Sequence, residues 1–294
     1  DDVSVSNSDN DSTGITVNPT SGLTTTEAGG TATFTVVLNS QPSADVTIAL
    51  SSSNTNEGTV APTPLTFTSA NWNTAQTVTV TGVDDAIVDG SVNYTILTAA
   101  AASADATYNG VDASDVTVTN NDNDSAGITV NPTSGLTTTE AGGTATFTVV
   151  LNSQPSADVT IALSSSNTNE GTVAPTPLTF TSANWNTPQT VTVTGVNDAI
   201  VDGSVNYTIV TAAAVSADGT YNGVDAADVS VSNSDNDSAG ITVNPTSGLT
   251  TTEAGGTATF TVVLNSQPSA DVTIALSSSN TNEGTVAPTP LTFT

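Results

Sequence analysis

The sequence predicts an all-β protein made of tandem antiparallel β-sandwich repeats, and two observations support this prediction. A string beginning GITVNPTSGLTTTEAGGTATFTVVL starts at Gly14 and recurs at Gly127 and Gly240, 113 positions apart each time. Within a repeat, short runs alternate threonine with apolar residues, and clusters of Gly, Pro, Asn and Ser separate them. A period of 113 residues is too long for a solenoid unit and fits one globular domain.

The alternating runs predict the individual strands, because side chains on a half-buried strand face the core at every second position. In the first repeat we expect strands at about 14–18, 23–26, 31–38, 45–51, 58–67, 76–83, 91–98 and 114–120. So many short strands with no helical period indicate an Ig-like sandwich. The stretch 99–113, which begins with four alanines, is interpreted as a long loop before the last strand.

The repeat divides the chain into two complete units and two partial ones. Residues 14–68, 127–181 and 240–294 are identical, and the run Asp2–Ser6 matches Asp228–Ser232. We therefore expect the last strand and junction of a preceding repeat at 1–13, sandwiches at 14–126 and 127–239, and an N-terminal half-repeat at 240–294. The chain begins and ends inside a repeat and lacks an initiating Met, so a longer parent chain is expected.

The composition excludes several classes of function. The 294 residues include no Lys, Arg, His, Cys or Met, but 28 Asp and Glu. General acid–base catalysis, activated nucleophiles and phosphate clamps usually need one of the missing groups, so we expect no enzyme. A chain without cations cannot neutralise phosphates, so nucleic acid is not an expected partner. No apolar run approaches 18 residues, so no membrane insertion is expected in this segment.

Two clusters of carboxylates are candidates for a metal site. One is the junction Asn121–Asp124, which recurs at 234–237 and at 8–11. The other is Asp84–Asp85 with Asp89, in the turn after a strand. Both clusters, and the turn that begins at Glu27, can meet at one pole of a sandwich. Two carboxylates about 4 Å apart repel by roughly 1 kcal/mol in water and about 4 kcal/mol at an effective dielectric of 20.

A bound cation would relieve this repulsion, and hard oxygen ligands in loops suit Ca²⁺ better than Mg²⁺ or Zn²⁺. The alternative is that these are solvated turn residues, since Asp and Asn favour turns for backbone reasons. For Asp105, Asn109 and Asp112 the turn interpretation is preferred over a second ion. Asp45 and Glu57 are interpreted as surface or turn residues.

The order of these motifs resembles the Calx-β-like and Ig-like tandem repeats of very large bacterial cell-surface adhesins. The resemblance rests on a Glu-Ala-Gly-Gly turn before FTVVL, then TFTSANWNTAQTVTVTGVDD, then SVNYTI, then a closing NDND. It implies calcium ligands at Glu27, Asp84, Asp85, Asp89, Asp122 and Asp124, with repeat copies at Glu140, Asp198, Asp202, Asp235, Asp237, Asp9 and Asp11. The sequence departs from the family pattern at Asn123, inside the terminal acidic cluster, and at Asn197, which replaces Asp84 in the second repeat.

The leading functional hypothesis is a structural extender, a stalk or filament segment of a secreted or surface-anchored adhesin that Ca²⁺ at the inter-repeat junctions makes rigid. The alternative is an adhesive module that binds a surface glycan or a protein receptor. Only 4% of residues are aromatic, which disfavours a sugar-stacking groove, and Trp72 is interpreted as a core or pole-capping residue. Expected partners are neighbouring repeats of the same chain and further copies in a fibre, where residues 2–8 would pair with sandwich strands. The resemblance implies an extracellular location.

Overall fold

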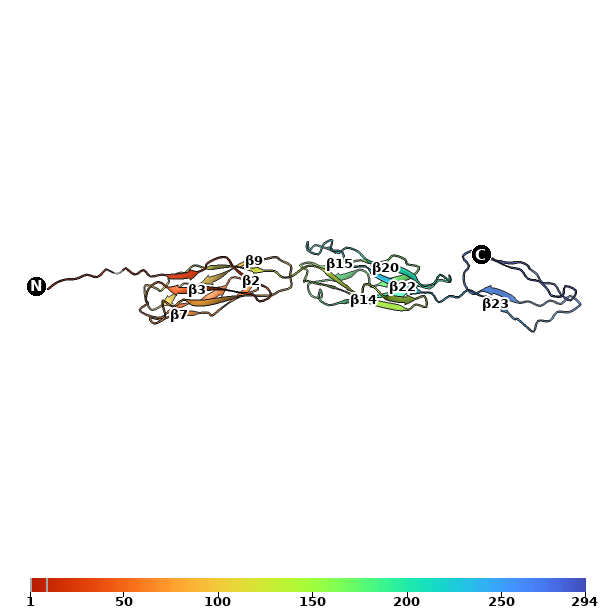
Figure 1. The fold of residues 1–294 in the computed structure, drawn as a ribbon, viewed down its shortest axis with the longest axis horizontal. Helices are drawn as coiled ribbons and strands as arrows, with labels where there is room; N and C mark the ends of the chain where they lie inside the picture. Colours follow the sequence, from red (N-terminus) through yellow and green to blue (C-terminus); the bar gives the residue numbers. More distant parts are fainter. Residues whose placement is uncertain (1, 9) are drawn as a thin grey trace. The chain divides into compact units, whose positions relative to one another are not determined.

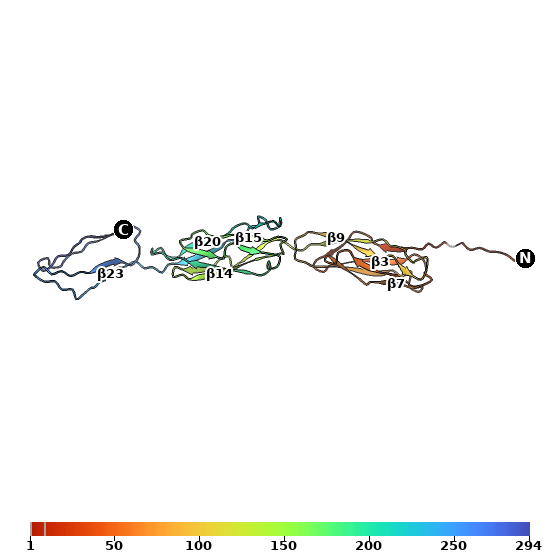
Figure 2. The same ribbon diagram turned by 180° about the vertical axis from the view of Figure 1, so that it is seen from behind.

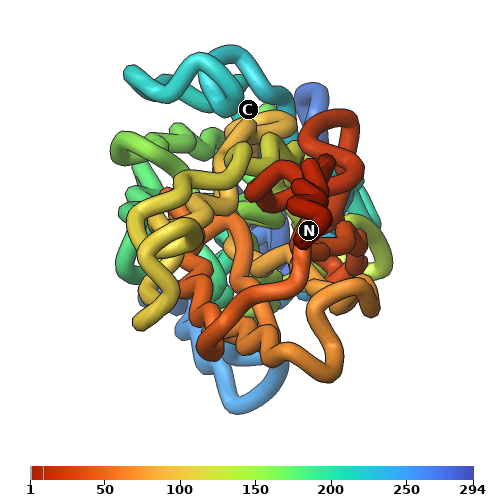
Figure 3. The backbone as a smooth tube through the Cα atoms, turned by 90° about the vertical axis from the view of Figure 1, so that its left-hand side faces the viewer, coloured from red at the N-terminus to blue at the C-terminus, as the bar shows by residue number. Residues whose placement is uncertain are grey.

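A computed structural model describes residues 2–8 and 10–294 of the chain. Every regular element in it is a β-strand, which confirms the all-β prediction (Figure 1). The described residues include no helix long and apolar enough to cross a membrane. The chain divides into two compact units, Asp1–Ala126 and Gly127–Thr294. Figures 2 and 3 show the chain from two further directions.

The first unit is a sandwich of two four-stranded sheets with a small third sheet. One sheet has the order β1-β3-β8-β6, with β1 (Ile15–Asn18), β3 (Thr31–Leu38), β8 (Gln76–Gly82) and β6 (Gly58–Ala61). The second has the order β2-β11-β9-β5, with β2 (Leu23–Thr26), β11 (Val116–Asn121), β9 (Val92–Thr98) and β5 (Leu50–Ser52). The third contains β10 (Ala102–Ser103), β4 (Val46–Ile48) and β7 (Leu65–Phe67).

The core follows the period-two pattern of the sequence. On β3 the side chains of Phe34, Val36 and Leu38 are buried, while Thr35 and Val37 between them are half-buried. Val78 and Val80 on the neighbouring β8 are also fully buried, and Trp72 packs against this core. The threonine and valine runs therefore build each sheet with one apolar face, as expected for a sandwich.

The expected strand at 45–51 is in fact two strands, because the chain changes sheets at Ala49. The segment before Ala49 pairs with β7 and β10, and the segment after it pairs with β9. The Thr63 side chain supports this crossing, since Leu50 N donates to Thr63 Oγ1 at 2.8 Å and Thr63 Oγ1 donates to Leu50 O at 2.9 Å.

Three further details differ from the sequence expectation. The expected strand at 58–67 is interrupted between β6 and β7, where Pro62 and Pro64 provide no backbone N–H for a ladder. The expected loop at 99–113 contains the short strand β10. Finally, β11 pairs with β9 in the antiparallel sense but with β2 in the parallel sense, so the sandwich is not purely antiparallel.

In the second unit, each strand of the first recurs 113 positions later. These strands are β12 (Ile128–Asn131), β13 (Leu136–Thr139), β14 (Thr144–Leu151), β15 (Val159–Ile161), β16 (Leu163–Ser165), β17 (Gly171–Ala174), β18 (Leu178–Phe180), β19 (Gln189–Gly195), β20 (Val205–Thr211), β21 (Val215–Ser216) and β22 (Val229–Ser234). Residues 240–294 add two short ladders, β23 (Ile241–Asn244) with β24 (Thr261–Leu264) and β25 (Val272–Ile274) with β26 (Leu291–Phe293). Phe260 is 36% exposed whereas Phe34 is 1% exposed, because residues 240–294 contain no counterpart of β8.

The described residues 2–8 form no strand, and Val3 and Val5 are 87% and 85% exposed. The corresponding strand in the second unit, β22, lies between β13 and β20. Pairing of residues 2–8 with sandwich strands of another repeat stays a prediction.

Candidate metal centre

The candidate ligands of the first unit follow strand ends that meet at one pole. Glu27 follows β2, while Asp122 and Asp124 follow β11, and these two strands are parallel neighbours that end together. The Glu27 backbone N donates to Asn121 O at 3.1 Å, which fixes the two ends side by side. Gly82, the last residue of β8, donates to Gly30 O at 3.0 Å, so the end of the other sheet reaches the same place.

Backbone hydrogen bonds orient the carboxylates of this pole. Asn123 N donates to Glu27 Oε2 at 3.1 Å. The two oxygens of Asp122 accept from different backbone groups, Asp124 N at 2.7 Å and Gly90 N at 2.8 Å. Carboxylate oxygens of Glu27, Asp122 and Asp124 lie within 4.8 Å of one another, so the three could hold a metal ion.

A second carboxylate group adjoins the first and includes Glu57, a turn residue that the sequence did not favour as a ligand. Oxygens of Glu57, Asp85 and Asp89 also lie within 4.8 Å of one another. Glu57 was expected to be a surface or turn residue without a metal role, yet it is only 5% exposed. It is held between the end of β8 and β11, since Val83 N donates to Glu57 O at 3.0 Å and Asn120 Nδ2 on β11 donates to Glu57 Oε2 at 3.3 Å. Asp45, by contrast, is exposed as expected.

The second unit repeats the arrangement with a shared ligand. Its two groups are Glu140, Asp202 and Asp235, and Glu170, Asp198 and Asp202. Because Asp202 belongs to both groups, two ion positions at this pole could share one carboxylate. Asp237 lies outside these groups, although its first-unit counterpart Asp124 belongs to one.

The remaining candidates lie outside the four groups. Asp84 is exposed and accepts a hydrogen bond from Asn123 Nδ2 at 3.2 Å. Asp11 is exposed as well, and Asp9 lies outside the described residues. Asp105 behaves as a turn residue, as preferred from the sequence. Hydrogen bonds from Thr107 and from Ser43 N lower its pKa, and its oxygens hold the loop 105–107 against Ser43.

The electrostatics of the pole are unfavourable without a cation. Burial raises the pKa of Glu27 to about 7; the hydrogen bond from Asn123 N opposes this, and the charges of Asp122, Asp85 and Asp89 add to it. Burial and neighbouring carboxylates likewise raise the pKa values of Asp89 and Asp124. Burial is also the main cause of the raised pKa of Glu140.

Two buried oxygens point to what the pole would bind. Among the described residues, Asp124 Oδ2 and Asp237 Oδ2 are buried side-chain atoms with no hydrogen-bond partner. A buried carboxylate oxygen needs a donor or a cation, and the chain has no Lys, Arg or His to supply either from a basic side chain. The residues therefore fit a hard divalent cation that takes oxygen ligands from flexible loops.

The raised pKa of Glu27 predicts that the metal-free protein loses stability as pH rises. A carboxyl that binds its proton more tightly when folded stabilises the fold fully below its unfolded value of 4.5, and that stabilisation is lost as pH rises through about 7. In metal-free buffer, the free energy of unfolding should therefore be higher at pH 5.5 than at pH 8. Urea denaturation at both pH values measures it. The lowered pKa values of Asp105 and Asp235 change the stability only below about pH 4, so they do not contribute between pH 5.5 and pH 8. Equal free energies at the two pH values would show that Glu27 titrates normally.

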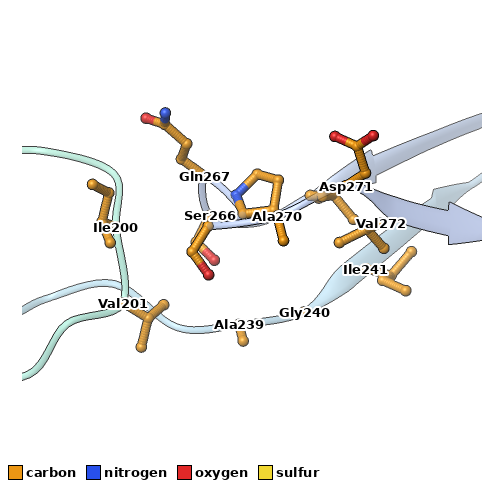
Figure 4. Close-up of a pocket in the computed structure, with 13 residues that line it drawn as sticks. Ile200, Val201, Ala239, Gly240, Ile241, Ser266, Gln267, Ala270, Asp271 and Val272 are labelled. Atoms are coloured by element: carbon orange, nitrogen blue, oxygen red, sulfur yellow. The ribbon is translucent and has the colours of Figure 1, made fainter. Parts of the chain in front are cut away.

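One apolar cavity of the second unit borders the loop that carries Asp198 and Asp202 (Figure 4). It measures about 690 Å³ and lies between Ile200–Val201 and the segments 239–241 and 264–272. Gln267 N donates to Ala199 O at 2.6 Å beside it. No aromatic side chain lines the cavity, and Asp271 is its one carboxylate, so it has no carboxylate cluster like those of the poles.

Comparison with known proteins gives structural neighbours only. No family model matches the chain, and no curated protein matches it. Among solved structures, CBD12 from CALX1.2 is 15% identical with a TM-score of 0.35, covering 74% of this chain and 98% of that one. The calcium binding domain CBD12 of CALX1.1 is 16% identical with a TM-score of 0.33, covering 68% and 80%. Domains 4 and 5 of the S-layer protein SbsC are 20% identical with a TM-score of 0.29, covering 64% and 75%.

Proposed function

We propose that this chain is a calcium-stabilised structural segment of an extracellular surface protein, in which tandem sandwiches provide length. The observation that supports it best is the recurrence of two carboxylate groups in each unit, in a chain with no basic side chain. Glu27 and Glu140 are only 2% and 3% exposed, so the charge they bring to each pole is buried. Burying several like charges is costly unless a cation binds them.

Calcium at this pole would tie the two sheets of a sandwich together. Glu27, Asp122 and Asp124 extend from β2 and β11 of one sheet. Asp85 and Asp89 follow β8 of the other sheet, and Glu57 directly precedes β6. An ion that takes six to eight oxygens at about 2.3–2.6 Å would link loops that otherwise repel one another.

The extender role is supported by the sequence between the sandwiches. Residues 122–126 connect β11 to the next repeat with two aspartates and no long Gly/Ser spacer, so the link is short. Near-identical tandem copies add length to a stalk, whereas they add little to an enzyme, and we propose no catalytic role. Calcium at each pole would restrict how far neighbouring sandwiches can swing, so the stalk would be stiffer with calcium than without it.

Calcium titration of the whole chain, with small-angle scattering, tests this function. Calorimetry should show saturable calcium binding, and the maximum dimension should shorten when calcium is removed. Asp122→Asn with Asp124→Asn should weaken binding by at least about tenfold at the first pole, because two ligand charges are lost. Asp45→Asn, an exposed change outside the four groups, is the matched control and should leave binding unchanged. If the unaltered chain shows no saturable binding, the carboxylates are solvated turn residues.

A further inference from the structure

The two poles are not identical in charge. Comparing residues 14–126 with 127–239, the single difference in charged residues is Asp84, which Asn197 replaces. Neither residue belongs to the carboxylate groups. Both nevertheless lie against the chain that carries the ligands, since Asn123 Nδ2 donates to Asp84 Oδ1 at 3.2 Å and Asn236 Nδ2 donates to Asn197 Oδ1 at 2.8 Å.

The hydrogen bonds at this position differ between the two units. Asn197 Nδ2 donates to the backbone oxygen of Asp198 at 2.7 Å, so that carbonyl is occupied in the second unit. An aspartate at position 84 has no such donor, and the carbonyl of Asp85 keeps both lone pairs for other partners. The second pole therefore has one negative charge fewer, and its Asp198 carbonyl already accepts one hydrogen bond.

Each pole also carries an independent sign of a missing ligand. Asp124 Oδ2 in the first unit and Asp237 Oδ2 in the second are both buried without a hydrogen-bond partner. Asp124 directly follows Asn123, whose side-chain amide contacts Asp84. Asp237 likewise follows Asn236, whose amide contacts Asn197. The negative charge of Asp84 therefore lies near the unpartnered oxygen of the first unit. The second unit has the neutral Asn197 at the same place.

We infer that the two repeats bind calcium with unequal affinity, tighter in the first, and that position 84/197 sets the difference without ligating the ion. The inference rests on the proposed calcium function. One additional negative charge near a divalent cation, partly screened by solvent, corresponds to a difference of about tenfold in dissociation constant. The chain would then fill its poles in two steps, so that its response to calcium spreads over a wider concentration range than identical sites would give.

Calorimetric calcium titration of the whole chain in low salt tests the inference with two reciprocal variants. The unaltered chain should show two classes of sites about tenfold apart. Asn197→Asp should tighten the weaker class until the two merge, and Asp84→Asn should weaken the tighter class until they merge at lower affinity. Asp45→Asn removes an exposed charge outside the poles and should change neither class. Because Asp84 is exposed, the separation should shrink at 1 M KCl.

The outcomes separate this inference from the function on which it rests. A chain that binds no calcium contradicts the proposed function itself. A chain that binds calcium in a single class, or whose two classes do not move in Asn197→Asp and Asp84→Asn, leaves the calcium function standing and overturns the role of position 84/197. A separation that persists unchanged at 1 M KCl also overturns it, because a charge effect from an exposed residue must be screened.

Discussion

Removal of calcium is expected to lower the melting temperature of the 294-residue chain by about 10 °C. Binding to the folded state alone stabilises it by roughly 2.7 kcal/mol when free calcium is 100-fold above the dissociation constant. Without the ion, Glu27 keeps a raised pKa and Asp124 keeps an unpartnered buried oxygen, so the poles are strained electrostatically. Differential scanning calorimetry at pH 7.5, in calcium and after chelation, measures the shift.

Two controls make this result specific. Potassium at matched ionic strength should not restore the melting temperature, because screening alone supplies no ligand-bridging ion. The double variant Asp122→Asn with Asp235→Asn, which removes one carboxylate from each pole, should show a smaller difference in melting temperature with and without calcium than the unaltered chain. If chelation leaves the melting temperature of the unaltered chain unchanged, the ion has no stabilising role.

Much of the fold could be predicted from the sequence because its strands alternate so regularly. The run from Thr31 to Leu38 places Phe34, Val36 and Leu38 on one face, and all three are buried. The change of sheet at Ala49 could not be predicted, because the residues on either side alternate without interruption. Two hydrogen bonds between the Thr63 side chain and the Leu50 backbone stabilise that crossing, and no pattern in the residues near Ala49 indicates them.

The candidate site could also be predicted only where its residues are close together in the sequence. The aspartate pairs after β8 and β11 are conspicuous as runs, and the structure gathers Asp85, Asp122 and Asp124 into carboxylate groups. Glu57 was missed because it is a lone acid in a turn, and its partners Val83 and Asn120, which are distant in sequence, meet it only in the folded chain. A compositional signal was present, since glutamate occurs at only two positions in each repeat while most acids are aspartate. In the first repeat these positions are Glu27 and Glu57, and both are buried.

The double variant Glu27→Gln with Glu140→Gln is expected to change stability in opposite directions with and without calcium. In metal-free buffer at pH 7.5 the variant should be more stable than the unaltered chain, because in each unit a carboxylate with a raised pKa is replaced by a neutral amide. Glutamine can still accept from Asn123 N, and its new amide donor lies among carboxylates that include Asp124, with its unpartnered Oδ2. In calcium the same variant should be less stable than the unaltered chain, because each pole loses a charged ligand.

Urea denaturation in calcium and after chelation measures both signs on the same protein. Calcium affinity should fall by about 100-fold, since removing a ligand costs at least as much as the 10–100-fold typical of groups that only support one. The exposed pair Asp45→Asn with Asp158→Asn removes the same number of charges. It should change the free energy of unfolding by no more than about 0.5 kcal/mol, with or without calcium. A variant destabilised equally in both conditions would mean that Glu27 and Glu140 act as structural hydrogen-bond acceptors. A variant stabilised equally in both would mean that the poles repel but bind nothing. Only a reversal of sign on adding calcium identifies these two buried carboxylates as ligands.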